Sequence, residues 1–242
     1  MAAVVAAGAV ALVVGVLGAP SKGEDTPVKV GRPRPSPTSN AGLSPTPTAT
    51  PAHPPVIRGF RFPIEGACLP AEDELIPNAP REYRFGVHEG VDFYPDRACT
   101  KIERGMPVLA AKTGIVIRAA VDYKDITQEE MDGLLARSGQ QGFTDPADLD
   151  RLRGRQVWID HGDGVVSRYC HLLSIEPGMA EGVVVAAGQM VGRVGNSGTP
   201  EGVIDPNLEN HLHFEIRVGD SYLGQGLPVA ETRRLWQEAF SP

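Results

Sequence analysis

The segment HLHFEIRV, residues 211–218, alternates polar and apolar side chains in the pattern of a half-buried β-strand. Residues two apart in a strand point to the same side, so His211, His213 and Glu215 share one face. The opposite face is apolar and consists of Leu212, Phe214 and Ile216. We therefore expect the apolar side to anchor the strand in a core and the imidazole side to face a cleft. An H-x-H pair arises often by chance and is a weak signal on its own.

The flanking sequence predicts more short strands. Three β-branched runs punctuated by glycine and proline cover residues 107–120, 154–173 and 182–195. This pattern predicts a mainly β, compact fold built on a largely antiparallel sheet. The chain ends in LPVAETRRLWQEAF, residues 227–240, which is typical of a packed C-terminal helix with Val229, Leu235 and Trp236 among its apolar positions.

One stretch, roughly residues 122–153, departs from the strand pattern. Thr127 is followed three residues later by Glu130, which is the signature of a capping box at a helix start. Asp145 is placed as an N-cap, with Pro146 at the first helical position. The sequence therefore predicts a helical hairpin inserted between two strands.

The chain divides into three parts by composition. Residues 1–19 are uncharged and apolar, and they are long enough for an N-terminal membrane anchor, with a signal sequence as the alternative. Residues 20–56 are rich in Pro, Thr and Ser, so we expect a disordered, extended linker. Residues 57–242 then form the folded domain. This order predicts an extracytoplasmic domain, either anchored to the membrane or secreted to the cell envelope.

Charge and cysteine content narrow the function classes. A net charge of −7 over 242 residues argues against a nucleic-acid partner, which normally meets a basic surface. The chain has three cysteines, without the close paired spacing of a structural zinc knuckle. Cys68 and Cys99 could form a disulfide in an oxidising compartment, a pairing that spacing alone does not decide. Cys170 is interpreted as a small buried residue.

Two other segments carry candidate site residues. In GVHEGVDFYP, residues 86–95, His88 and Asp92 lie on one side of an extended chain, and both are suitable zinc ligands. A surface pair is an equal alternative. In SRYCHLL, residues 167–173, His171 lies at a predicted strand end, where a lone histidine is usually structural. His161, at a Gly-rich turn, is assigned to that structural class.

Together His88, Asp92 and His213 would supply three protein ligands to one Zn²⁺. A catalytic zinc keeps its fourth position open for water, whereas a structural zinc is closed by four protein ligands. His171 and His211 would remain for proton transfer and for stabilising an oxyanion. Glu215 is a candidate to orient a zinc ligand through a hydrogen bond. A salt bridge on the sheet surface is the alternative.

The ordered motifs H-x-G-x-D at 88–92, HG-x-G with Y-x-HL at 161–172, and HLHFE at 211–215 resemble the lysostaphin/LytM-type zinc endopeptidases. The resemblance covers about residues 57–225. It implies a compact, largely antiparallel β architecture with a narrow groove, and a peptide of bacterial peptidoglycan as the substrate. It also implies His88, Asp92 and His213 as zinc ligands, with His171 and His211 as the catalytic pair.

The sequence departs from that family in two places, and two other functions compete. The 122–153 insertion is longer than a simple turn, and we interpret it as a solvated decoration in preference to a lid or wall. Asn210 precedes the first histidine of HLHFE in place of a small residue or proline.

A non-catalytic LytM-type scaffold or regulator is the main alternative function. A lipoyl- or biotinyl-type carrier modified at Lys112 is a weaker one.

Overall fold

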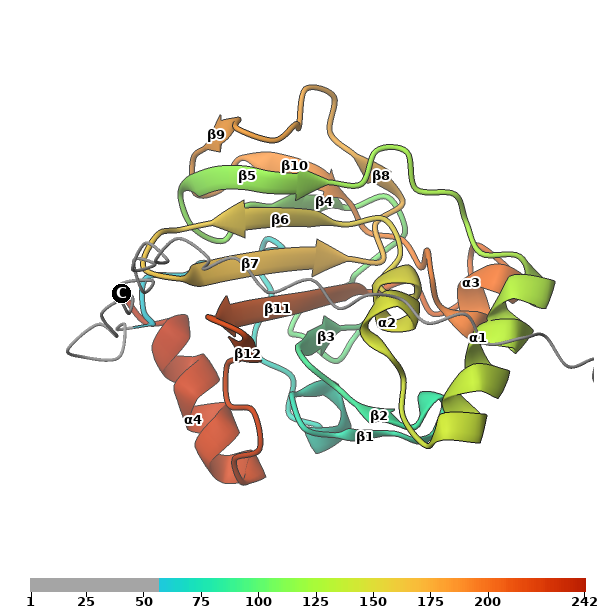
Figure 1. Cartoon of the computed structure of the whole chain (residues 1–242). Coiled ribbons are helices and arrows are strands. Elements are labelled where there is room, and N and C mark those ends of the chain that lie inside the picture. The colour runs from blue at the N-terminus through green and yellow to red at the C-terminus, as the bar shows by residue number, and fades with distance from the viewer. Residues whose placement is uncertain (1–56) are drawn as a thin grey trace, which may run out of the picture. The chain divides into compact units, whose positions relative to one another are not determined.

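The computed structural model describes residues 57–242 (Figure 1). The anchor or signal sequence predicted for residues 1–19 and the linker predicted for 20–56 lie outside the described residues. No helix formed by residues 57–242 is both long and apolar enough to cross a bilayer. The strands are β1 Pro80–Arg81, β2 Gly86–Val87, β3 Val91–Phe93, β4 Pro107–Leu109, β5 Gly114–Ala119, β6 Val157–Asp160, β7 Val165–Cys170, β8 Ser174–Ile175, β9 Val184–Val185, β10 Met190–Arg193, β11 Leu212–Val218 and β12 Ser221–Tyr222.

A seven-stranded sheet dominates the domain. Its order is β12-β11-β7-β6-β5-β9, and β3 pairs with β11 off this path. A three-stranded sheet, β4-β10-β8, lies behind β5 in Figure 1, and β1 pairs with β2. All of these pairings are antiparallel. The predicted fold class, mainly β and largely antiparallel with an inserted helical hairpin and a C-terminal helix, is therefore confirmed.

The main hydrophobic core joins both larger sheets and the last helix. Side chains of β4, β5, β6, β7, β10 and β11 form one buried cluster. On β11 the apolar face predicted from the sequence is fully buried, since Leu212, Phe214 and Ile216 are each 0% exposed. The helix α4, Val229–Ala239, adds Trp236, whose ring lies 6.0 Å from that of Phe214. This packing holds the opposite, polar face of β11 in a fixed position.

The inserted hairpin forms as the sequence predicts. The helix α1, Gln128–Gln141, begins after Thr127, whose side chain accepts a hydrogen bond from the Glu130 amide. The helix α2, Pro146–Leu152, begins after Asp145, which accepts from two backbone amides. A small separate cluster packs the pair together and consists of Ile126, Met131, Leu134 and Leu152. A third helix near this end of the sheet, α3 Pro200–Ile204, was not predicted (Figure 1).

A disulfide joins Cys68 to Cys99. It ties the chain that follows β3 to the segment that precedes the short 3-10 helix Asp73–Leu75. Cys170 has a free, buried thiol. The pairing that the spacing left open is therefore present, and it constrains the loop on one side of β3.

Removing this disulfide is expected to lower the stability of the domain. A cross-link between residues 31 apart in sequence lowers the conformational entropy of the unfolded chain. In the chain-entropy model this stabilises the folded state by about 3–4 kcal/mol. The double variant Cys68→Ser, Cys99→Ser should therefore unfold at a lower temperature than the oxidised protein, as measured by circular dichroism. Reduced wild-type protein is the matched control and should unfold with the double variant. Equal unfolding temperatures for oxidised protein and double variant would contradict this expectation.

Candidate metal centre

The pairing of β3 with β11 brings the three predicted ligands together. His213 lies directly across from Asp92 in the register of these strands, and His88 precedes β3. His213 Nδ1 is 2.7 Å from Asp92 Oδ1, and His88 Nε2 is 2.9 Å from the same oxygen. The two ring nitrogens are 3.0 Å apart. All three side chains are buried, and one possible donor atom from each lies within 4.8 Å of the other two.

Hydrogen bonds on the far side of each ring assign the tautomers of the two histidines. His88 Nδ1 lies 3.1 Å from the carbonyl oxygen of Ile76, which can only accept, so the ring proton is on Nδ1. His213 Nε2 lies 3.2 Å from Glu215 Oε1, which places its proton on Nε2. His88 Nε2 and His213 Nδ1 therefore present lone pairs to each other and to the Asp92 carboxylate. A metal ion at the centre, or a proton on His213 Nδ1, satisfies this arrangement.

The donor set fits zinc. Two neutral imidazoles and one carboxylate are a common catalytic zinc set, in which water takes the fourth position. Tetrahedral ligands at about 2.0–2.1 Å from zinc are about 3.3 Å from each other. The three donor atoms are 2.7–3.0 Å apart, so outward shifts of a few tenths of an ångström would admit the ion. The second carboxylate oxygen of Asp92 is already held, at 2.9 Å, by Arg81.

The pKa shifts favour the metal-binding protonation state at His88 and Asp92 but oppose it at His213. Burial lowers the pKa of His88 to about 4, so this ring is neutral near pH 7. Burial acts to raise the pKa of Asp92, but His88 and His213 hold it well below its ordinary value. At His213, burial acts to lower the pKa, but Asp92 and Glu215 raise it above its ordinary value. A proton and a metal therefore compete for His213 Nδ1.

His171 and His211 lie beside this cluster. Their ring centroids are 4.9 Å apart, and His171 is 5.6 Å from His213. His171 Nδ1 bonds the carbonyl of Ser197 at 2.9 Å, and His211 Nδ1 bonds that of Glu209 at 2.7 Å. Each ring therefore carries its proton on Nδ1 and has a free lone pair on Nε2. Burial lowers the pKa of both rings, so both are neutral proton acceptors near pH 7.

Tyr94, Arg81 and Arg153 also belong to the site, although the sequence motifs did not predict them. The Tyr94 ring stacks on His211 with centroids 4.1 Å apart and planes at 15°. The sequence contains a hint of this position, because Tyr94 is two residues beyond Asp92 on the same extended segment and therefore shares its side. His161, assigned to the structural class, is bonded to the Thr113 carbonyl and the Ser167 hydroxyl. It does not line the cleft.

The five predicted site residues open into a cleft of about 550 Å³. One wall comes from the insertion, through Leu135 of α1 and Leu149 of α2. The interpretation of the insertion as a solvated decoration is therefore wrong, because its apolar side chains face the same cavity as the histidines. Asn210, the second departure from the family pattern, is buried and donates to the Pro206 carbonyl.

Two imidazoles and a carboxylate that line a cleft form the kind of ligand set that a catalytic metal site uses, with one position left for water or substrate. The model of peptidase family M23 matches residues 86–225, which is more than half of the chain and includes all five predicted site residues. The chain belongs to this family. The resemblance to lysostaphin/LytM-type peptidases is confirmed. The family match argues against the alternative of a lipoyl- or biotinyl-type carrier modified at Lys112.

Solved structures with similar chains include three bacterial proteins, two of them named as peptidases and one as an M23 protein. A mutant catalytic domain of the prophage-encoded M23 protein EnpA from Enterococcus faecalis is 23% identical, with a TM-score of 0.35, over 56% of this chain and 74% of that chain. The catalytic domain of the antimicrobial peptidase lysostaphin from Staphylococcus simulans is 22% identical, with a TM-score of 0.36, over 61% and 80%. A zinc containing peptidase from Vibrio cholerae is 21% identical, with a TM-score of 0.42, over 71% of this chain and 41% of that chain.

Proposed function

We propose that residues 57–242 form a zinc-dependent metalloendopeptidase that hydrolyses peptide bonds in peptidoglycan cross-bridges or stem peptides. The observation that carries this proposal is the convergence of three lone-pair donors within 2.7–3.0 Å, beside two neutral histidines at a cleft. Family M23 membership supports the peptidase class. The peptidoglycan substrate rests on the resemblance to lysostaphin/LytM-type enzymes.

In this proposal His88 Nε2, Asp92 Oδ1 and His213 Nδ1 would hold the ion. Bound zinc supplies a Lewis acid, and it lowers the pKa of water towards neutrality. His171 and His211 present their Nε2 lone pairs to the cleft, where one of the two would accept the proton of the attacking water. Once protonated, that nitrogen would donate a hydrogen bond to the developing oxyanion and then pass its proton to the leaving amine. The stacked Tyr94 ring and the Glu209 carbonyl keep the His211 ring in one orientation.

The proposed location is extracytoplasmic, where peptidoglycan is found. The Cys68–Cys99 disulfide supports an oxidising compartment, because disulfides persist mainly outside the cytosol. Anchoring or secretion through residues 1–19, and a tether over 20–56, stay predictions from the sequence.

Digestion of purified peptidoglycan by the full-length protein tests the proposal. We expect soluble fragments with new amino termini when zinc is present, none after chelation, and recovery when zinc is added back. Mass spectrometry of the fragments identifies the bond that is cleaved. Stoichiometric zinc without any cleavage would favour the alternative function, a scaffold or regulator of another cell-wall hydrolase.

A further inference from the structure

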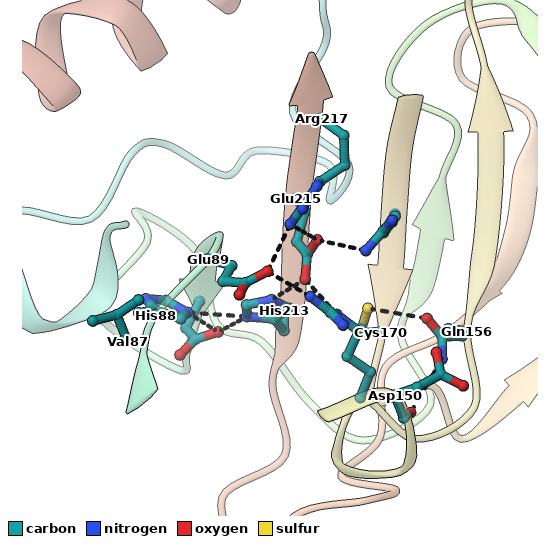
Figure 2. A network of polar contacts seen from close by, with 12 residues as sticks. Val87, His88, Glu89, Asp150, Gln156, Cys170, His213, Glu215 and Arg217 are labelled. Carbon is teal, nitrogen blue, oxygen red and sulfur yellow. Dashed lines mark hydrogen bonds and ion pairs between the residues drawn. The ribbon is translucent and has the colours of Figure 1, made fainter. Parts of the chain in front are cut away.

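The inserted helical pair ends at Arg153, which is the C-cap of α2 and only 8% exposed. Its side chain enters a buried polar network beside the metal centre, in which Figure 2 shows Glu215, Glu89 and Arg217 next to His213. Arg153 Nε donates to Glu215 Oε1 at 2.6 Å, and Nη2 donates to Glu89 Oε2 at 2.7 Å. One guanidinium therefore links two carboxylates from different parts of the chain.

Both carboxylates lie next to predicted zinc ligands. Glu215 is 0% exposed, and its Oε1 accepts from the His213 ring as well as from Arg153. Glu89 directly follows His88 in the chain. A fully buried carboxylate keeps its charge and position only where cations and donors compensate it. Arg153 makes the shortest of the guanidinium contacts to Glu215, at 2.6 Å against 3.3 Å for Arg168 and 3.2 Å for Arg217.

The backbone at the same junction contacts the proposed catalytic pair. The His171 amide donates to the Arg153 carbonyl at 2.9 Å, and the Leu172 amide donates to the Arg155 carbonyl at 3.0 Å. His171 has a φ of +59°, a left-handed conformation that a non-glycine residue keeps only when its surroundings impose it. Between the two arginines, Gly154 packs so closely on the Ser197 carbonyl that a Cβ would collide with it. That carbonyl also accepts from the His171 ring.

We propose that Arg153 is a positioning residue, which fixes the His213 ring through Glu215 and the His171 backbone through its own carbonyl. The insertion is thereby coupled to the metal centre. This inference rests on the proposed function. Lysine cannot replace arginine here, because a single ammonium group does not provide the planar fork that reaches both carboxylates.

The experiment compares Arg153→Lys with Arg137→Lys in the full-length protein. Arg137 is a matched control, since it also makes a two-pronged contact, with Asp148 at 3.0 and 2.6 Å, inside the same insertion. Zinc affinity is measured by competition with a chromophoric chelator, and the ligand field by the visible absorption of the Co²⁺-substituted protein. We expect Arg153→Lys to weaken zinc binding about 10- to 100-fold, as loss of a ligand-orienting partner does. The Co²⁺ bands should shift in Arg153→Lys and stay unchanged in Arg137→Lys.

Equal zinc affinity and identical Co²⁺ spectra in Arg153→Lys and wild type would overturn the inference. If wild-type protein binds no zinc, the proposed function fails instead, so the two failures are distinguishable. Should Arg153→Lys not fold, Glu215→Gln decides, because Glu215 Oε1 is the atom that links Arg153 to the His213 ring. A several-fold weaker zinc affinity in folded Glu215→Gln supports the inference, and an unchanged affinity overturns it.

Discussion

His213→Ala is expected to remove zinc and peptidase activity together. If a zinc-binding free energy of about 10–16 kcal/mol is shared by four ligands, one ligand contributes about 2.5–4 kcal/mol, or roughly 60- to 700-fold in affinity. Activity at limiting zinc should fall by the same factor. The fold should persist, because Glu215 keeps Arg153, Arg168 and Arg217 as partners. His88→Ala and Asp92→Ala are expected to behave alike.

Zinc content by atomic absorption and cleavage of purified peptidoglycan give the two readouts. His161→Ala is the matched control, since it removes an imidazole that is bonded to Thr113 and Ser167 away from the cleft. It should retain stoichiometric zinc and activity. A His213→Ala protein that still binds zinc with wild-type affinity would mean that the cluster is not the metal site.

His171→Ala and His211→Ala are expected to separate zinc binding from turnover. Neither ring belongs to the cluster of donor atoms, so zinc content should stay at the wild-type level. Loss of a group that transfers protons in the transition state lowers kcat by about 100- to 10,000-fold. The measurement is kcat on a soluble peptide substrate at saturating zinc, alongside metal analysis of the same sample.

The result for these two variants also tests the assignment of roles. Loss of zinc in either variant would make that histidine a ligand and would end the division into three ligands and a catalytic pair. Unchanged kcat with full zinc would leave the ring without a part in the reaction. Because His171 has a positive φ, His171→Gly is a useful companion that removes the imidazole without backbone strain.

Much of the site could be predicted because its signals are local. The alternation along β11 has a period of two, so the shared face of His213 and Glu215 follows from strand geometry alone. The helix starts at Thr127 and Asp145 follow from capping side chains a few residues away. The helix α3 is only five residues long, and its few helical positions give no periodic pattern to detect.

The remaining features depend on contacts between distant parts of the chain. Asp92 and His213 are 121 residues apart, and only the β3–β11 register shows that their side chains meet. Arg153 lies at the end of a charged helix, a position that ordinarily faces solvent. Arg153 is buried because the insertion rejoins the sheet at this point. No local sequence pattern predicts where that junction lies in the fold. Shared motifs with a known family supplied the roles that geometry alone left open.

The junction at Arg153–Arg155 limits how this domain can be recombined. Swapping the inserted helices between M23 peptidases is an obvious route to a new substrate range, because Leu135 and Leu149 form a cleft wall. A graft that ends after Arg155 would replace Arg153, the nearest arginine partner of Glu215, and the segment whose carbonyls accept from the His171 and Leu172 amides. Exchange boundaries placed before Leu152 would leave the recipient's own junction intact, so that selectivity could be changed without rebuilding the reaction centre.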